Sequence, residues 1–273
     1  MTTEHIVNFL EDFSIEVTPN AANKIEKFED FLPIGTFIYI AHIEGTPIED
    51  TVSTAKKITD QGFRAMPHFP ARIIKDKVML SEWISMYKNE AGVENALLIA
   101  GGANKPYGDY DSSIQLIESE LFDQADFKNL HIAGHPEGNK DIDPDGTTSN
   151  VDEALSWKNE FSKRTNASMA ITTQFCFDSN SVIEWANNIK KSGIDIPVHI
   201  GIAGPAKLQT LLRYSIECGV GASIKILQKR AKDITKLLLP YKPTQIIQEL
   251  AKHKAENPDF NIEKVHFLSL IHI

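Results

Sequence analysis

Residues 169–204 read MAITTQFCFDSNSVIEWANNIKKSGIDIPVHIGIAG, and this stretch carries the clearest signal of the fold class. It begins and ends with apolar runs, 169–175 and 198–204, of the kind found in strands that are buried on both faces. Between the runs, residues 179–191 repeat apolar side chains at the spacing of a helix with one buried face: Val182, Ile183, Ala186 and Ile189. The stretch therefore predicts a strand, a helix and a second strand parallel to the first.

The same alternation runs through the rest of the chain. The predicted strands are 13–17, 37–43, 64–69, 96–101, 129–135, 169–175, 198–204 and 265–270. Further amphipathic helices are expected at 48–61 and 206–217. Such an array can close as a doubly wound open sheet or as an eight-stranded barrel. Eight strands in 273 residues favour a single (βα)8 TIM-type barrel of the α/β class, with residues 1–273 as one catalytic domain.

Composition excludes several classes of protein. The chain is 42% hydrophobic and 24% charged, as in ordinary globular proteins, and its net charge is −9, which argues against a nucleic-acid or acidic-membrane binder. It has no apolar run of about 20 residues for a membrane helix and no basic segment typical of a secretory signal. The two cysteines, Cys176 and Cys218, lie in apolar stretches and are expected to be buried and unreactive. We expect a cytoplasmic enzyme.

The last six residues, 268–273, read LSLIHI. The same six residues are the translation of the end of an adapter used in sequencing libraries, so we expect a non-native tail after Phe267. The alternative is that LSLIHI is the second half of a natural apolar strand, VHFLSLIHI.

Polar residues at the predicted strand ends mark the candidate site, because the active face of a βα barrel is its C-terminal rim. These residues are Glu16, His42, His68, His135, Glu137, Gln174 and Asp178. Glu16 lies between Ile15 and Val17, so desolvation should raise its pKa and suit it to general acid catalysis. The alternative for Glu16 is an ion pair with a Lys or Arg of the barrel.

Other motifs are weak or absent. The histidines show no His-x-His on a strand and no His-x-x-x-His on a helix, so we expect no metal site, and we expect their rings to bond ligands or cap loops. The stretch GGANKPYGDYD, residues 101–111, is rich in glycine but lacks the Rossmann and P-loop spacings. The chain has no Gly-x-Ser-x-Gly, the motif of a serine hydrolase.

Taken together, the strand-end motifs resemble those of the methylenetetrahydrofolate reductase family. They occur in the family's order across nearly the whole chain: Ile15-Glu16-Val17-Thr18-Pro19, Pro67-His68-Phe69, His135-Pro136-Glu137-Gly138, Thr172-Thr173-Gln174-Phe175-Cys176-Phe177-Asp178, Ile200-Gly201-Ile202 and His266-Phe267. The motif around Gln174 is the most specific of these.

The resemblance implies a βα barrel that binds FAD at the C-terminal strand ends and passes a hydride from NAD(P)H through the flavin to methylenetetrahydrofolate. Glu16 would be the catalytic acid that opens the folate's five-membered ring, and Gln174 and Gln209 would bind the folate substrate. The residues implied to bind the cofactor are His68, Gly101, Gly102, Ala103, Tyr110, Asp111, His135, Asn139 and Lys158. Members of the family commonly form homo-oligomers.

Several positions depart from the family pattern. Gly101-Gly102-Ala103 stands where the family has Arg-Gly-Asp, and Ala41 stands where it has a flavin-contacting Thr. His135 and Asn139 replace a Tyr and a His, while either Lys158 or Lys163 could supply the expected basic group. The sequence therefore indicates a divergent member, whose flavin we expect to be reduced more easily than in typical members. Alternatives are a flavin-free reductase, a methyltetrahydrofolate-binding methyltransferase and a non-catalytic folate-binding protein.

Overall fold

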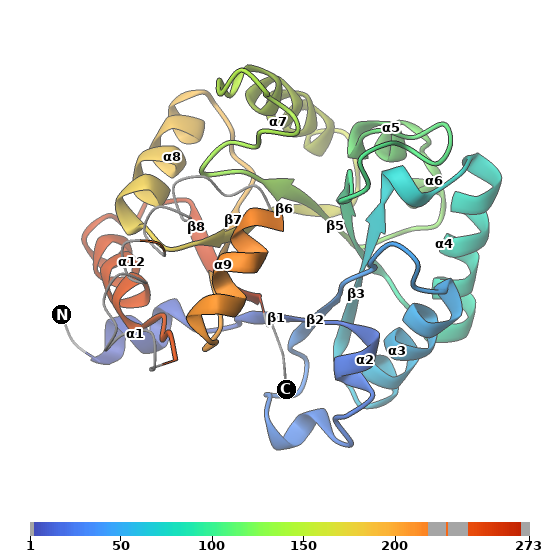
Figure 1. Cartoon of the computed structure of the whole chain (residues 1–273), viewed down its shortest axis with the longest axis horizontal. Helices are drawn as coiled ribbons and strands as arrows, with labels where there is room; N and C mark the ends of the chain where they lie inside the picture. The colour runs from blue at the N-terminus through green and yellow to red at the C-terminus, as the bar shows by residue number, and fades with distance from the viewer. Residues whose placement is uncertain (1–2, 218–227, 229–239, 269–273) are drawn as a thin grey trace. The chain divides into compact units, whose positions relative to one another are not determined.

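The computed structural model describes residues 3–217, 228 and 240–268 (Figure 1). Eight parallel strands form a closed barrel in chain order, which confirms the predicted (βα)8 barrel. The strands are β1 (Ser14–Val17), β2 (Phe37–Ile40), β3 (Arg64–Pro70), β4 (Asn95–Ile99), β5 (Asn129–Gly134), β6 (Ser168–Cys176), β7 (Val198–Ala203) and β8 (Ile262–Leu268). Each overlaps a predicted strand. β2 ends three residues earlier than predicted, and β8 begins three residues earlier.

Helices follow most of the strands, and the helix predicted at 179–191 has exactly those bounds in α8. The helical elements are α1 (Thr3–Phe9), α2 (Pro19–Ala22), η1 (Phe28–Asp30), α3 (Ile48–Asp60), η2 (Ala71–Ile73), α4 (Lys77–Ala91), α5 (Ser113–Glu118), α6 (Leu121–Gln124), α7 (Ser149–Ser162), α8 (Ser179–Lys191), α9 (Leu208–Glu217) and α12 (Thr244–Glu256). α8 begins where Asp178 accepts hydrogen bonds from the amides of Asn180 and Ser181. α9 begins two residues later than predicted.

The chain divides into two compact units, and each is described by itself. The β1–β5 unit comprises Ser14–Ala133 and Phe161–Ala170. The β6–β8 unit comprises Met1–Phe13, Gly134–Glu160 and Ile171–His272. The single domain expected from the sequence stays a prediction.

In the β1–β5 unit, neighbouring strands are aligned so that their inward side chains form layers. Glu16 pairs in register with Tyr39, and Tyr39 pairs with Met66. Because successive strand residues point to opposite faces, these three side chains lie on one face, and Tyr39, Met66 and Leu97 form an apolar cluster there. Outside the strands, α3 packs against α4 (Figure 1).

In the β6–β8 unit, β6 carries a bulge that redirects one residue of the strand. Its register against β7 shifts between Thr172 and Phe175, so Gln174 lies at the irregularity. Gly201 permits the close approach of β7, because a Cβ atom there would lie 2.3 Å from the Thr173 carbonyl oxygen. The Gly201 amide donates to the Thr173 hydroxyl at 2.8 Å. On the outside, α1 packs against α12 (Figure 1).

Two further predictions can be compared with the structure. Cys176 is a free, buried cysteine whose pKa is raised well above its usual range by burial, as expected for an unreactive thiol. Cys218 and residues 269–273 lie outside the described residues. No helix among the described residues has both the length and the apolar character needed to cross a membrane.

Candidate active site

Glu16 and His68 meet at the ends of β1 and β3. The Glu16 Oε2 atom lies 3.3 Å from His68 Nε2, an ion-pair distance without the geometry of a hydrogen bond. The Glu16 side chain is 21% exposed and the His68 side chain 9% exposed, so the carboxylate is the more accessible of the two. This arrangement gives a partly desolvated carboxyl group at the rim, with an imidazole that can orient it. The raised pKa expected for Glu16 stays a prediction.

A second polar pair lies on the inner face of the same unit. The Tyr39 hydroxyl and His131 Nδ1 are 2.5 Å apart, and both residues are buried. Tyr39 also meets the His68 ring edge to face, with centroids 6.4 Å apart. Sequence reasoning missed this pair, although the two-residue period of strands 37–40 and 129–134 was the signal that could have pointed both side chains inward. Tyr39 therefore packs against the ring that approaches Glu16.

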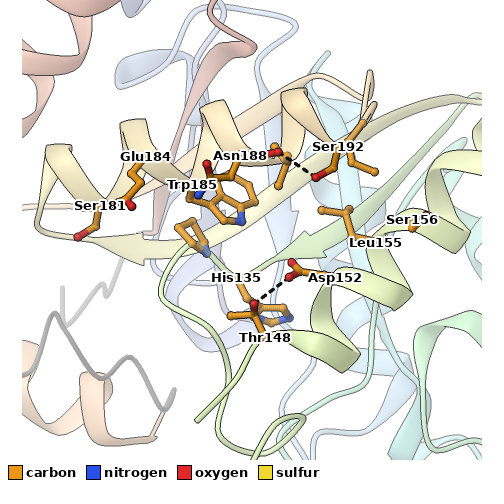
Figure 2. A pocket seen from close by; sticks show the side chains of 13 residues that line it. His135, Thr148, Asp152, Leu155, Ser156, Ser181, Glu184, Trp185, Asn188 and Ser192 are labelled. Atoms are coloured by element: carbon orange, nitrogen blue, oxygen red, sulfur yellow. Dashed lines mark hydrogen bonds between the residues drawn. The ribbon is translucent and has the colours of Figure 1, made fainter.

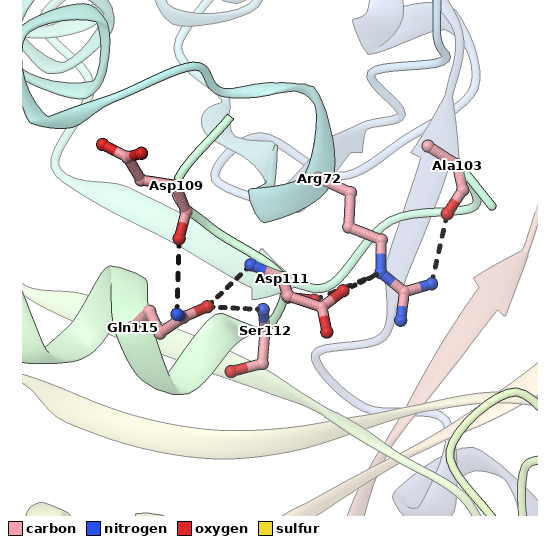
Figure 3. Close-up of polar contacts among 6 residues, drawn as sticks. All are labelled: Arg72, Ala103, Asp109, Asp111, Ser112 and Gln115. Carbon is pink, nitrogen blue, oxygen red and sulfur yellow. Dashed lines mark hydrogen bonds and ion pairs between the residues drawn. The ribbon is translucent and has the colours of Figure 1, made fainter. Parts of the chain in front are cut away.

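The loop after β4 is fixed by an arginine that the sequence analysis did not single out. Arg72 donates from Nε to the Asp111 carboxylate at 2.8 Å and from Nη1 to the Ala103 carbonyl at 3.2 Å (Figure 3). Gly101 has φ +96°, and a Cβ atom there would lie 2.9 Å from the Pro70 Cβ atom. The loop therefore needs glycine at position 101. Its far end, at Asp111, is bonded to the guanidinium group of Arg72 in η2.

Tyr110 and Asp111 lie where this loop enters α5. Gln115 accepts hydrogen bonds from the amides of Asp111 and Ser112, forming a capping box (Figure 3). Tyr110 is buried, and its pKa is raised first by burial and then by Asp109 and Asp76. The Asp111 carboxylate faces solvent apart from its bond to Arg72. The structure thus brings Ala103 and Asp111 together on one arginine.

His135, Lys158 and Gln174 interact within the β6–β8 unit. The His135 ring forms a hydrogen bond with the Gln174 side chain, and since Nδ1 has no partner among the described residues, the bond uses Nε2. Burial and, to a smaller extent, the charge of Lys158 together lower the pKa of His135 to about 4. Burial also lowers the pKa of Lys158 to about 8.

Lys158 is the better of the two lysine candidates. It lies on the buried side of α7, whereas Lys163 is exposed just after this helix. No described residue forms a hydrogen bond or an ion pair with the Lys158 ammonium group. Burial makes the charged form of Lys158 costly, and an anionic ligand would offset this cost.

Two other predicted residues have different surroundings. The Asn139 side chain accepts from the Asp141 amide at 2.9 Å and helps to order the loop before α7. Within that loop, the Asp143 carboxylate accepts hydrogen bonds from the amides of Asn150 and Val151 in the first turn of α7. Gln209 is exposed in the first turn of α9. The structure thus gives Asn139 a local role and leaves the Gln209 side chain exposed.

A cavity of about 380 Å³ adjoins His135, between α7 and α8 (Figure 2). Thr148 and Asp152 line it from the side of α7, with a 2.8 Å bond between their side chains, and Glu184 and Trp185 line it from α8 (Figure 2). Its lining mixes polar and apolar side chains, and His135 is its one basic residue among those described. Among the described residues, no group of three or more His, Cys, Asp or Glu side chains is placed to hold a metal ion.

Comparison with known proteins indicates the same family as the strand-end motifs. The family model of methylenetetrahydrofolate reductase matches residues 14–270. A similar solved structure is an uncharacterised protein from Clostridium thermocellum that binds two copies of 5-methyl-5,6,7,8-tetrahydrofolic acid. The two chains are 12% identical with a TM-score of 0.59, over 98% of this chain and 93% of that one. At this identity the structural likeness concerns the fold.

Proposed function

The chain belongs to the methylenetetrahydrofolate reductase family, and we propose that it is a folate-dependent oxidoreductase. The proposed reaction interconverts methylenetetrahydrofolate and methyltetrahydrofolate, with FAD as cofactor and NAD(P)H as co-substrate. The observation that carries the proposal is the Glu16–His68 contact, which places a carboxyl group beside an imidazole at the strand ends of a barrel of this family. Folate binding by a protein of similar fold adds support for the substrate class.

Glu16 is proposed as the general acid. Its carboxyl group would donate a proton to the folate, so that the five-membered ring opens to the reactive iminium. The partial burial of Glu16 supports this role because desolvation favours the protonated carboxyl group. His68, 3.3 Å away, would orient the carboxyl group and return a proton after turnover.

Gln174 is proposed to bind the pterin ring of the folate. A side-chain amide carries both a donor and an acceptor, which suits the edge of a pterin. The bulge in β6 supports this role because it sets the direction of Gln174, and the bond to His135 restrains the amide. His135 would thereby position Gln174, and its contact with the cofactor stays a prediction. Gln209 stays a weaker candidate for the same substrate.

The residues present are compatible with FAD. The unpaired Lys158 ammonium suits a diphosphate, and His68, Tyr110 and Asp111 come from the segments that the family uses for the flavin. The chemistry that bound FAD supplies is the passage of a hydride from NAD(P)H to the folate. Gly101, Gly102 and Ala103 would offer backbone groups to the cofactor, because their side chains carry no charge.

One experiment tests this function directly. The visible spectrum of the purified chain is recorded after addition of FAD, then NADH or NADPH, then methylenetetrahydrofolate. Flavin bands that bleach with the nicotinamide and return with the folate are expected. Retained flavin without a response to folate would contradict the proposal.

A second function is favoured by one specific observation. The loop at 101–103 lacks both family charges, and Arg72 makes its contacts with the protein's own Ala103 and Asp111. A chain with this loop could bind folate without flavin, as a flavin-free reductase or a methyltransferase acting on methyltetrahydrofolate. Titration with methyltetrahydrofolate separates the two functions: folate binding by a chain that takes up no FAD would favour the flavin-free function.

A further inference from the structure

A second cavity, of about 440 Å³, lies wholly within the β1–β5 unit. It is formed by the segments after β2, β3 and β4 and by the beginning of α4. Neither Glu16 nor His68 lines it. Its walls combine an aromatic surface, two basic side chains and one polar atom without a partner. These three features together point to a ligand.

The polar atom is Nδ1 of His42. The other ring nitrogen, Nε2, lies 3.0 Å from the Thr46 carbonyl oxygen, which can only accept a hydrogen bond. Nε2 therefore carries the hydrogen, and Nδ1 is an acceptor in the neutral ring. Burial lowers the pKa of His42, which keeps the ring neutral. Nδ1 is buried and has no hydrogen-bond partner in the part of the chain that the structure describes, so a ligand N–H would satisfy it.

The aromatic surface is made by His42 and Trp83. Their rings stack with centroids 4.8 Å apart and an interplanar angle of 23°, and both side chains line the cavity. Tyr107 also lines it, and 70% of its surface is exposed. The Tyr107 backbone is anchored, because its amide donates to the Arg72 carbonyl at 2.8 Å. The cavity thus offers aromatic faces to a flat ring.

The charged side chains in the lining are Arg72, Lys105 and Glu44. With His42 neutral, they give the cavity a net positive charge in a chain of net charge −9. Arg72 is held in place by Asp111 and Ala103, whereas Lys105 is exposed at the surface. An anionic group would be attracted to these two basic residues.

We propose that this cavity binds a planar nitrogen heterocycle that donates an N–H to His42 and carries an anionic tail. The ring would lie beside the edge of His42, in the plane of the Nδ1 lone pair, and against Trp83, with its tail toward Lys105 and Arg72. Adenine nucleotides and folates share this chemistry. The proposal does not depend on the hydride-transfer reaction, since neither Glu16 nor Gln174 takes part.

The test is isothermal titration of the full chain with two probes, AMP and folic acid. The variants are His42→Phe, which keeps an aromatic ring but removes Nδ1, and Lys105→Gln, which removes an exposed charge. Lys56→Gln on α3 is the matched control, because Lys56 forms an exposed ion pair with Asp60 and does not line the cavity. Folic acid is also titrated into Gln174→Ala, which weakens the folate site proposed at the barrel rim.

We expect at least one probe to bind with a Kd that His42→Phe raises about three- to tenfold and Lys105→Gln about two- to fivefold. Lys56→Gln should leave the Kd unchanged.

Binding of AMP alone identifies a nucleotide site, and binding of folic acid that survives Gln174→Ala identifies a second folate site. Absence of binding by both probes at millimolar concentration overturns the proposal, as does a Kd that is the same in Lys105→Gln and in the control. If Gln174→Ala loses hydride transfer while the cavity still binds its probe, the result bears on the proposed function and leaves this proposal standing.

Discussion

Glu16 on β1 and His68 on β3 approach to 3.3 Å, although a whole strand, β2, lies between them in the barrel. The contact is possible because both side chains point inward and because Tyr39, on the intervening strand, packs against the His68 ring. A carboxyl group and an imidazole from alternate strands therefore meet at the rim. In an enzyme of this family, this pair is where proton transfer to the folate is expected.

Glu16→Gln should lower kcat by about 10²- to 10⁴-fold, because an amide keeps the shape of the side chain but cannot donate a carboxyl proton. The Kd for methyltetrahydrofolate should change by less than about threefold. The measurement pairs steady-state kinetics with equilibrium binding. Glu26→Gln, on an exposed loop, is the control and should keep full activity. Turnover by Glu16→Gln equal to that of the unsubstituted chain would remove Glu16 from the mechanism.

The barrel could be predicted from the sequence because apolar side chains recur with one spacing in strands and another in helices. The eight apolar runs and the spacing of Val182, Ala186 and Ile189 depend only on which side chains face the core. Glu16 could likewise be singled out, since a carboxylate between two apolar residues of a strand is unusual. These are local signals, and the structure agrees with them to within a few residues at each end.

Contacts between distant segments could not be predicted in the same way. Arg72 follows β3 by two residues, and nothing near it in the chain indicates that it bonds Ala103 and Asp111. The bond between Tyr39 and His131 joins residues 92 positions apart. Such contacts depend on register and on loop paths, which are set by packing across the whole barrel. The burial of Lys158 could not be predicted either, because Lys163 in the same stretch carries the same charge and the sequence does not distinguish the two.

Gly101→Ala should destabilise the chain by about 1–3 kcal/mol, because residue 101 has φ +96° and an added methyl would meet Pro70 at 2.9 Å. Gly102→Ala is a matched control one residue away, with nothing within 4 Å of the added Cβ atom and no positive φ. It should change the free energy of unfolding by less than about 0.5 kcal/mol. Urea denaturation of both variants measures the difference, and equal stabilities would show that the loop adapts to a side chain at 101.

His199 should make the folded state less stable in acid. Burial, followed by the charges of Lys264 and His266, lowers its pKa from 6.5 to about 3. Below pH 6.5 the unfolded chain therefore binds a proton that the folded chain does not, so stability is lost as pH falls from about 6.5 toward 3.

His199→Gln should remove about 3 kcal/mol of this pH dependence between pH 6.5 and 4, measured by urea denaturation at a series of pH values. His5→Gln, near the N-terminus, is the control and should leave the slope unchanged. A slope in His199→Gln equal to that of the unsubstituted chain would mean that the imidazole takes up its proton with no penalty in the folded state.

Lys158→Met should stabilise the chain at pH 7 and weaken the binding of an anionic cofactor. Burial lowers the pKa of Lys158 from 10.5 to about 8, so the charged form costs the folded state about 3 kcal/mol at neutral pH. Methionine has a similar shape without the charge, and it should recover this energy. Because the unfolded chain holds its proton up to about pH 10.5, the advantage of the variant should shrink as pH rises from 8 to 10.5.

Thermal and urea denaturation at pH 7 and pH 10 measure the change in stability, and titration with FAD measures binding. Lys163→Met is the matched control, because Lys163 is exposed and its replacement should alter stability by less than about 0.5 kcal/mol. A Lys158→Met chain that is less stable than the unsubstituted protein would show that the ammonium group is held by favourable contacts. A more stable variant with lost FAD affinity would show that the chain keeps a destabilising charge for its ligand, the exchange of stability for function that an unpaired buried lysine implies.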